Sequence, residues 1–294
     1  MIVAVASRKA SPGVTTLTAL LAAFWNEPDV FKVIIEADAS GGTLAARWST
    51  PHDLSWDPGL LAMSAVRGQL DIDVLRSVTQ PLTESVSIAA APPAPGQIES
   101  ALMSLGDKGA AALAAAEGVR AFVDCGRLAA SKPAIGIARR AALTLMVCRP
   151  NLEEIYAVQP GIRELQDAGC TVGLVCVGDG QYHPSEIAES CQVDLVGVVP
   201  DDERAANALT ANGFAAGRVF EKSGLAKRMA ELASHVQVRC AQSLVPHQRP
   251  IEVELGGAVE DTVAVEEAPA AVGFASLVQR QGPGSESSNG VGGG

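Results

Sequence analysis

Residues 2–18 read IVAVASRKASPGVTTLT, and the order of features in this stretch predicts the fold. Its first five residues are apolar and rich in Val, which is typical of a parallel strand buried on both faces. A loop of mostly small residues, 7–13, follows directly, and the apolar run Leu17 to Trp25 suits a packed helix. A strand, a loop and a helix in this order bring backbone N–H groups and the positive end of a helix to one point. The stretch therefore predicts a site for a phosphate group.

The loop matches the phosphate-binding pattern G-x-x-x-x-G-K-[ST] only in part. With Gly13 as the second glycine, Ser7 stands at the first glycine, Val14 at the lysine and Thr15 at the hydroxyl position. The lysine of the pattern offsets the charge of the β- and γ-phosphates, and an apolar side chain does not. Two alternatives stay open on the loop alone: a phosphate site with impaired hydrolysis, and a structural turn without a ligand.

The composition indicates a globular protein with a full core. With 294 residues, 48% of them hydrophobic and 19% charged, the chain is long enough for one sizeable α/β domain or two small ones. The six cysteines show no C-x-x-C spacing and lie mostly in apolar runs, so we expect buried free thiols in a reducing cytoplasm. No apolar run reaches the length of a membrane span. The net charge of −11 disfavours non-specific binding to DNA or to an anionic membrane surface.

Short apolar runs and helical segments alternate along the rest of the chain. We expect further strands at 33–36, 86–90, 119–124, 143–148, 172–177 and 193–199, with helices between them and a last helix at 225–245. This alternation predicts an α/β fold with a mostly parallel, doubly wound sheet covered by helices on both faces. The predicted organisation is one domain, 1–245, and a disordered tail, 246–294, which is acidic and rich in Gly and Ser. Within the tail, Val272 to Arg280 is apolar enough to dock on another surface.

Acidic residues follow or end two of the predicted strands. Asp38 comes just after the second strand, and Asp124 ends the fourth, with Gly126 two residues later. Ligands of open parallel sheets bind at the carboxyl ends of the strands, so both carboxylates are candidates for the phosphate site. For Asp38 the alternative is a solvated carboxylate in the turn before a helix. Arg127 reads most simply as an exposed, solvated arginine, and its alternative role is to offset the missing lysine.

These segments occur in the order found in the MinD/ParA family of P-loop ATPases, which the chain resembles over residues 1–240. The loop of that family reads K-G-G-x-G-K-[ST]. By this resemblance Lys9 matches the family's early signature lysine, Gly13 its last glycine and Thr15 its Mg²⁺-binding hydroxyl. The second lysine of the family's loop is replaced by Val14.

The resemblance also gives roles to the residues at strand ends. Asp38 matches the second Asp of the family's D-x-D segment, which is tied to activation of the attacking water, while Glu36 replaces the first. Asp124 matches the residue that helps to hold the Mg²⁺ shell. Gly126 matches, more loosely, the glycine whose backbone N–H approaches the γ-phosphate.

Two later segments extend the resemblance. Residues 149–154 are similar to the segment that passes under the nucleotide in the family. Residues 195–202 are similar to its L-G-x-[IV]-P-x-D segment beside the adenine, which makes Pro200 and Asp201 candidates for the base side. The alternative for this second segment is an ordinary helix start, with carboxylates at the positive end of the helix.

The resemblance implies three overlapping sets of site residues. The catalytic set is Lys9 and Asp38, and the metal set is Thr15, Asp38 and Asp124. The nucleotide-binding set is Lys9, Ala10, Ser11, Pro12, Gly13, Val14, Thr15, Thr16, Gly126, Pro200 and Asp201.

The resemblance further implies ATP and Mg²⁺ as cofactors, ATP hydrolysis if the protein is an active enzyme, and a face-to-face homodimer in which Lys9 reaches the partner's phosphates. Within the family, a loop this altered looks most like the CpaE/TadZ-like members that accompany pilus or secretion assembly machinery. We therefore expect a cytoplasmic positioning protein that recruits protein partners and meets the inner face of the membrane through them. The alternatives are a pseudo-ATPase scaffold that has lost the nucleotide, and a chromosome or plasmid partition ATPase, against which the acidic charge argues.

Overall fold

The computed structural model describes residues 1–9, 12–48, 54–129, 131–211 and 218–244. Two residues of the predicted nucleotide set, Ala10 and Ser11, lie outside them. The predicted tail, 246–294, lies outside them as well, together with its apolar segment Val272 to Arg280.

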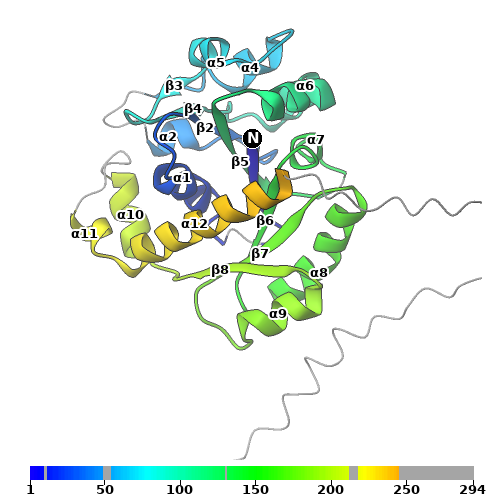
Figure 1. Ribbon diagram of the computed structural model, residues 1–294, viewed down its shortest axis with the longest axis vertical. Coiled ribbons are helices and arrows are strands. Elements are labelled where there is room, and N and C mark those ends of the chain that lie inside the picture. Colours follow the sequence, from blue (N-terminus) through cyan, green and yellow to red (C-terminus); the bar gives the residue numbers. More distant parts are fainter. Residues whose placement is uncertain (10–11, 49–53, 130, 212–217, 245–294) are drawn as a thin grey trace, which may run out of the picture. The chain divides into compact units, whose positions relative to one another are not determined.

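The described residues form one eight-stranded sheet (Figure 1). Its strands are β1 (Ile2–Ser7), β2 (Phe31–Glu36), β3 (Gln80–Pro81), β4 (Val86–Ala89), β5 (Val119–Arg127), β6 (Leu143–Cys148), β7 (Val172–Val177) and β8 (Asp194–Val199). Their order is β3-β4-β2-β5-β1-β6-β7-β8, and all neighbours are parallel except β3 and β4. The predicted fold class, an α/β fold with a mostly parallel sheet, is confirmed.

Burial follows the position of each strand in the sheet. β1 lies between β5 and β6, and every residue of β1 and of β6 is buried, as expected of apolar runs in central parallel strands. The edge strand β3 was not predicted, because two residues are too short to show a pattern and one of them is Pro81. β5 was predicted to end at Asp124 but continues to Arg127, so that Asp124 lies within the strand.

Helices cover both faces of the sheet (Figure 1). Their bounds are α1 (Val14–Phe24), α2 (Leu44–Arg47), α4 (Leu60–Ala65), α5 (Ile72–Val78), α6 (Pro95–Ala115), α7 (Ile135–Ala138), α8 (Leu152–Asp167), α9 (Pro184–Cys191), α10 (Glu203–Ala211), α11 (Arg218–Glu221) and α12 (Gly224–Leu244). α1 and α12 pack against each other on one face, while the pairs α6–α7 and α8–α9 pack on the opposite face (Figure 1). The predicted covering of both faces is therefore confirmed.

The core between β1 and the helices α1 and α12 fixes the first strand-loop-helix unit. Val3 and Val5 of β1 belong to a buried cluster shared with both helices. In the same cluster the rings of Trp25 and Phe122 meet edge-on, with 5.1 Å between their centroids. Because both ends of the loop are anchored in this close-packed core, the start of α1 is held against the end of β1.

All six cysteines are free and buried, as predicted. Burial raises the pKa of the Cys191 and Cys240 thiols to about 11. These thiols are therefore protonated, and poor nucleophiles, at neutral pH.

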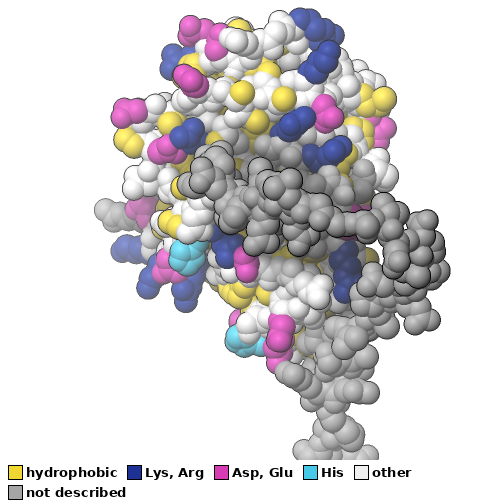
Figure 2. Space-filling model, turned by 45° about the vertical axis from the view of Figure 1, so that its right-hand side comes forward, with side chains coloured by type: hydrophobic (Ala, Val, Ile, Leu, Met, Phe, Trp, Pro, Cys, Tyr) yellow, Lys and Arg dark blue, Asp and Glu magenta, His cyan; other side chains and the backbone are white. Residues whose placement is uncertain are grey.

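The described surface is mixed in charge. On the face drawn in Figure 2, Lys and Arg side chains are interspersed with Asp and Glu, and the described positive charges form no continuous stripe there. Among the described helices none is both long and apolar enough to cross a bilayer.

Candidate functional site

The candidate site lies where β1 passes into α1. Gly13, the residue directly before α1, has φ 92° and ψ 24°, a left-handed conformation that glycine adopts at no steric cost. No described atom lies within 4 Å of the place where a Cβ would stand, so the backbone angle favours glycine here. The amide of Leu17 donates to the Gly13 carbonyl at 2.8 Å and closes the first turn. The N–H groups of this first turn are then free of helix partners and suited to an anion.

Val14, at the lysine position of the pattern, faces the core. Its side chain is 5% exposed and belongs to the buried cluster of β1, α1 and α12. The Val14 carbonyl accepts a hydrogen bond from Thr18 Oγ1 at 2.9 Å within the helix. Val14 therefore stabilises the start of α1 by packing, and it adds no charge to the loop.

Thr15 and Asp124 meet at the end of β1. Asp124 is buried, and its carboxylate accepts hydrogen bonds from the Thr15 hydroxyl and, at 3.0 Å, from the Gly126 amide. Burial raises the pKa of Asp124 to about 6, although the bonds from Thr15 and Gly126 act in the opposite direction. The nearby Asp38 charge raises this pKa further, and the Arg47 charge lowers it.

A bulge in β5 brings Asp38 and Gly126 together. Val5 pairs with Asp124 but Ser7 pairs with Arg127, so β5 contains one more residue than β1 between these pairs. Within the bulge Gly126 has φ 53°, and a Cβ there would lie 2.0 Å from the carboxyl carbon of Asp38. Asp38 thus occupies the space that a side chain at position 126 would fill. Its Oδ1 also accepts the Ser40 amide at 2.8 Å.

Glu36, which replaces the family's first Asp, ties together the segments around the site. Its buried carboxylate accepts the amides of Thr43 at 2.6 Å, of Leu44 at 3.0 Å and of Ala91 at 2.9 Å. These bonds join the end of β2 to the start of α2 and to the segment after β4. Burial raises the pKa of Glu36 to about 7, although the three backbone hydrogen bonds act to lower it. This role of Glu36 could not be predicted from the sequence, because its partners lie 7, 8 and 55 residues away in the chain.

A cavity of about 440 Å³ opens beside the start of α1. Of the predicted nucleotide set, Pro12, Gly13, Thr16, Pro200 and Asp201 line it. The structure therefore brings the loop and the predicted base-side segment to one cavity. Its wall also includes two arginines, one from α2 and one that follows β6, for which sequence reasoning proposed no individual role.

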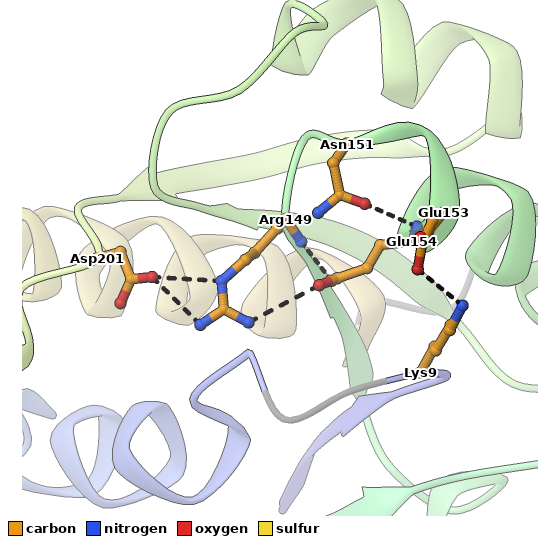
Figure 3. Close-up of polar contacts among 6 residues, drawn as sticks. All are labelled: Lys9, Arg149, Asn151, Glu153, Glu154 and Asp201. Carbon is orange, nitrogen blue, oxygen red and sulfur yellow. Dashed lines mark hydrogen bonds and ion pairs between the residues drawn. The ribbon is translucent and has the colours of Figure 1, made fainter.

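Arg149, the arginine after β6, is held between two carboxylates (Figure 3). Its Nε and Nη2 atoms each lie 3.2 Å from Asp201 Oδ2, and its Nη1 atom lies 3.7 Å from Glu154 Oε1. The Arg149 amide also donates to Glu154 Oε2 at 2.6 Å. Glu154 is itself fixed at the start of α8, where its amide donates to Asn151 Oδ1 at 2.9 Å. These contacts join the predicted segments 149–154 and 195–202.

Lys9 extends from the loop toward α8 (Figure 3). Its Nζ lies 3.0 Å from Glu153 Oε2, and both side chains are largely exposed, at 53% and 81%. The contacts of Asp38 run instead to Ser40 and Gly126. The two residues of the predicted catalytic set, Lys9 and Asp38, therefore have separate contact partners in the structure.

Arg127 is exposed and lies beside Ser40. Its Nη2 donates to Ser40 Oγ at 3.2 Å, and Arg127 is not among the residues that line the cavity. This position agrees with the simpler reading of Arg127 as a solvated arginine.

The fold is similar to those of MinD/ParA-type ATPases. A ParA family ATPase from Chlorobium tepidum matches with a TM-score of 0.67 at 18% identity, over 80% of this chain and 98% of that one. MinD from Pyrococcus horikoshii, complexed with Mg-ADP, matches with a TM-score of 0.62 at 18% identity, over 82% and 98%. An ATP complex of Cyanothece McdA matches with a TM-score of 0.58 at 13% identity, over 80% and 95%. No protein-family model and no curated protein sequence matches the chain.

At these identities the similarity shows the fold alone, an α/β architecture like that of the MinD/ParA-type ATPases. The Mg-ADP and ATP named above belong to those two relatives.

Proposed function

We propose that this chain is a MinD/ParA-type positioning or assembly protein that binds ATP with Mg²⁺ weakly, or hydrolyses it slowly, and recruits protein partners. The observation that carries the proposal is the contact between Thr15 and Asp124 beside the start of α1. A hydroxyl and a buried carboxylate are oxygen ligands suited to Mg²⁺ and its waters, and the helix N-terminus beside them is suited to phosphate.

The described residues fit such a ligand in several respects. In this proposal the first-turn amides of α1 hold the phosphates, Thr15 and Asp124 hold the Mg²⁺ shell, and Asp38 orients the attacking water. Pro200 and Asp201 flank the base from the wall of the cavity. Within the described ranges no group of three His, Cys, Asp or Glu side chains could hold a metal ion. Mg²⁺ commonly takes only one or two protein carboxylates and completes its shell with phosphates and water, so this result agrees with a nucleotide-borne ion.

The exposed position of Lys9 supports its proposed role in a homodimer. An ion pair as exposed as that of Lys9 and Glu153 contributes on the order of 0.5 kcal/mol, so Lys9 can leave Glu153 at little cost. In a face-to-face dimer it would then reach the partner's phosphates. The proposed partners are proteins, such as components of a pilus or secretion apparatus, and contact with the inner face of the membrane would run through them.

One observation favours a second candidate, a pseudo-ATPase scaffold. Val14 is packed in the core, so the loop lacks the lysine and its positive charge. A partition ATPase that works on DNA is less well supported, because the net charge is −11 and the positive charges of the face in Figure 2 are interspersed with negative ones.

Binding of a fluorescent ATP analogue with and without Mg²⁺ tests the proposal. We expect saturable binding by the full chain and a loss of about tenfold in Thr15→Val when Mg²⁺ is present, since one hydrogen-bonding ligand is removed without a change of shape. Thr18→Val is the matched control, because the Thr18 hydroxyl is also on α1 but bonds only within the helix.

The outcomes separate the candidates. Mg²⁺-dependent binding that Thr15→Val weakens and Thr18→Val leaves unchanged supports the nucleotide-binding protein. Absence of saturable binding by the native chain contradicts it and favours the scaffold. Release of phosphate from ATP, measured on the same samples, then distinguishes slow hydrolysis from binding alone.

A further inference from the structure

The altered loop leaves the phosphates of a bound nucleotide short of one positive charge. Val14 is buried in the core and cannot supply it. Of the described residues that line the cavity beside α1, two are cationic, Arg47 and Arg149. Any compensating charge that the described residues supply from the cavity wall must come from one of these two.

Arg149 is already neutralised by its neighbours. Its guanidinium lies between Asp201 and Glu154, with three N–O distances of 3.2 to 3.7 Å. A guanidinium held by two carboxylates has little net charge left for a third anion. Arg149 is therefore better suited to hold the segment after β8 in place.

Arg47 differs from Arg149 in its surroundings. Its side chain is exposed, and among the described residues no carboxylate forms an ion pair with it. Its charge nevertheless acts on the buried Asp124, the partner of Thr15. Arg47 thus faces the cavity and is close enough to the Thr15–Asp124 pair to influence it electrostatically.

The short helix α2 is fixed in a way that directs Arg47 to the cavity. Leu44 and Trp48, at either end of α2, are 0% and 1% exposed and belong to the core cluster. Glu36 accepts the Thr43 and Leu44 amides at the start of the helix. With both ends anchored and the start of the helix capped, the exposed side of α2 carries Arg47 along the cavity wall.

We propose that Arg47 supplies, from α2, the positive charge on the nucleotide phosphates that Val14 cannot supply from the loop. This inference rests on the proposed function, since it requires that the cavity bind ATP. A guanidinium presents several donors in a planar fork and binds phosphate oxygens through two hydrogen bonds at once. Glu36 is then a positioning residue, because it holds the helix that carries Arg47.

Calorimetric titration of the full chain with Mg-ATP and with adenosine tests this role. We expect Arg47→Ala to weaken Mg-ATP binding about 10- to 100-fold, the effect of losing a charge-assisted contact, and to leave adenosine binding within about twofold. Arg47→Lys keeps the charge but loses the planar fork, so it should recover only part of the Mg-ATP affinity. Arg127→Ala is the matched control, because Arg127 is an exposed arginine near the same edge that does not line the cavity.

The possible results differ in what they overturn. Native binding of Mg-ATP that Arg47→Ala leaves unchanged, or that Arg127→Ala weakens equally, overturns the role of Arg47 and leaves the proposed function intact. An equal loss of Mg-ATP and adenosine affinity in Arg47→Ala also overturns it, because adenosine carries no phosphate. If the native chain binds no Mg-ATP, the proposed function fails, and the role of Arg47 fails with it.

Discussion

The two ends of the candidate site are built in opposite ways. At the proposed phosphate end, Thr15, Asp38 and Asp124 lie around Gly126, and the carboxylates of the buried Asp124 and the half-buried Asp38 accept backbone amides at 3.0 and 2.8 Å. At the proposed base end, a cavity of about 440 Å³ is bordered by a half-exposed ion pair between Arg149 and Asp201. The phosphate end has no space for an added side-chain atom at Gly126. The base end is held by a half-exposed ion pair whose contacts water can replace.

This difference separates what the fold must preserve from what it can vary. A close-packed, desolvated arrangement is sensitive to the addition of one carbon atom, whereas an exposed ion pair contributes little to stability. Substitutions at the two ends should therefore have very different costs.

The largest effect is expected from Gly126→Ala at the phosphate end. The new Cβ would stand 2.0 Å from the Asp38 carboxyl carbon, and φ is 53°, so overpacking adds to backbone strain. We expect urea denaturation to show a loss of about 4 kcal/mol in the free energy of unfolding. Gly169→Ala is the matched control, since φ there is 86° but no described atom lies within 4 Å of its Cβ position. The control should lose about 1 kcal/mol, and equal losses would show that strain alone, without the contact to Asp38, accounts for the effect.

A smaller effect is expected from pH, through Glu36. Its pKa is raised by burial from an ordinary value of 4.5 to about 7, so the folded state binds this proton more tightly than the unfolded state. The associated stability is fully present below about pH 4.5 and is lost as the pH rises through about 7, a change of about 3 kcal/mol. Asp124, with its pKa raised to about 6, acts in the same direction. Urea denaturation over this range should show that Glu36→Gln reduces the slope; a slope that is unchanged in this variant would contradict the assignment to Glu36.

The smallest effect is expected at the base end. Asp201→Asn removes one carboxylate from Arg149, which keeps Glu154, and the side chain of Asp201 is 50% exposed. The loss in unfolding free energy should stay below about 1 kcal/mol, as for other surface ion pairs. Asp194→Asn, which breaks the surface pair with Arg239, is a suitable comparison. A loss at position 201 that matches the loss in Gly126→Ala would remove the contrast between the two ends.

The fold could be predicted because its signals are local. Each central strand is a short apolar run, and β1, β6 and β7 begin and end at or next to the predicted residues. The structure brings Asp38, Asp124 and the start of α1 close together, as expected where the carboxyl ends of parallel strands meet, although Asp124 lies within β5 and does not end it. The extension of β5 was missed, since its bulge depends on pairing with β1, and nothing in the sequence of β5 alone encodes that pairing.

The parts of the site that escaped prediction depend on contacts between distant segments. Glu36 looked like a simple replacement, yet its carboxylate bonds to an amide 55 residues away. Arg47 lies in a four-residue helix that is too short for any periodicity, so its approach to the cavity appears only in three dimensions. The roles of Glu36 and Arg47 depend on contacts between distant segments, and a single sequence does not show those contacts.

The six buried cysteines have a practical consequence. Because every native thiol is inside the fold, a maleimide dye should react slowly with the intact protein, and one cysteine added at the surface can be labelled without removing the others. The slow reaction of the native thiols is informative in itself. The labelling rate of these buried thiols reports how often the sheet and its helices open locally to solvent, so it measures local unfolding without any added probe.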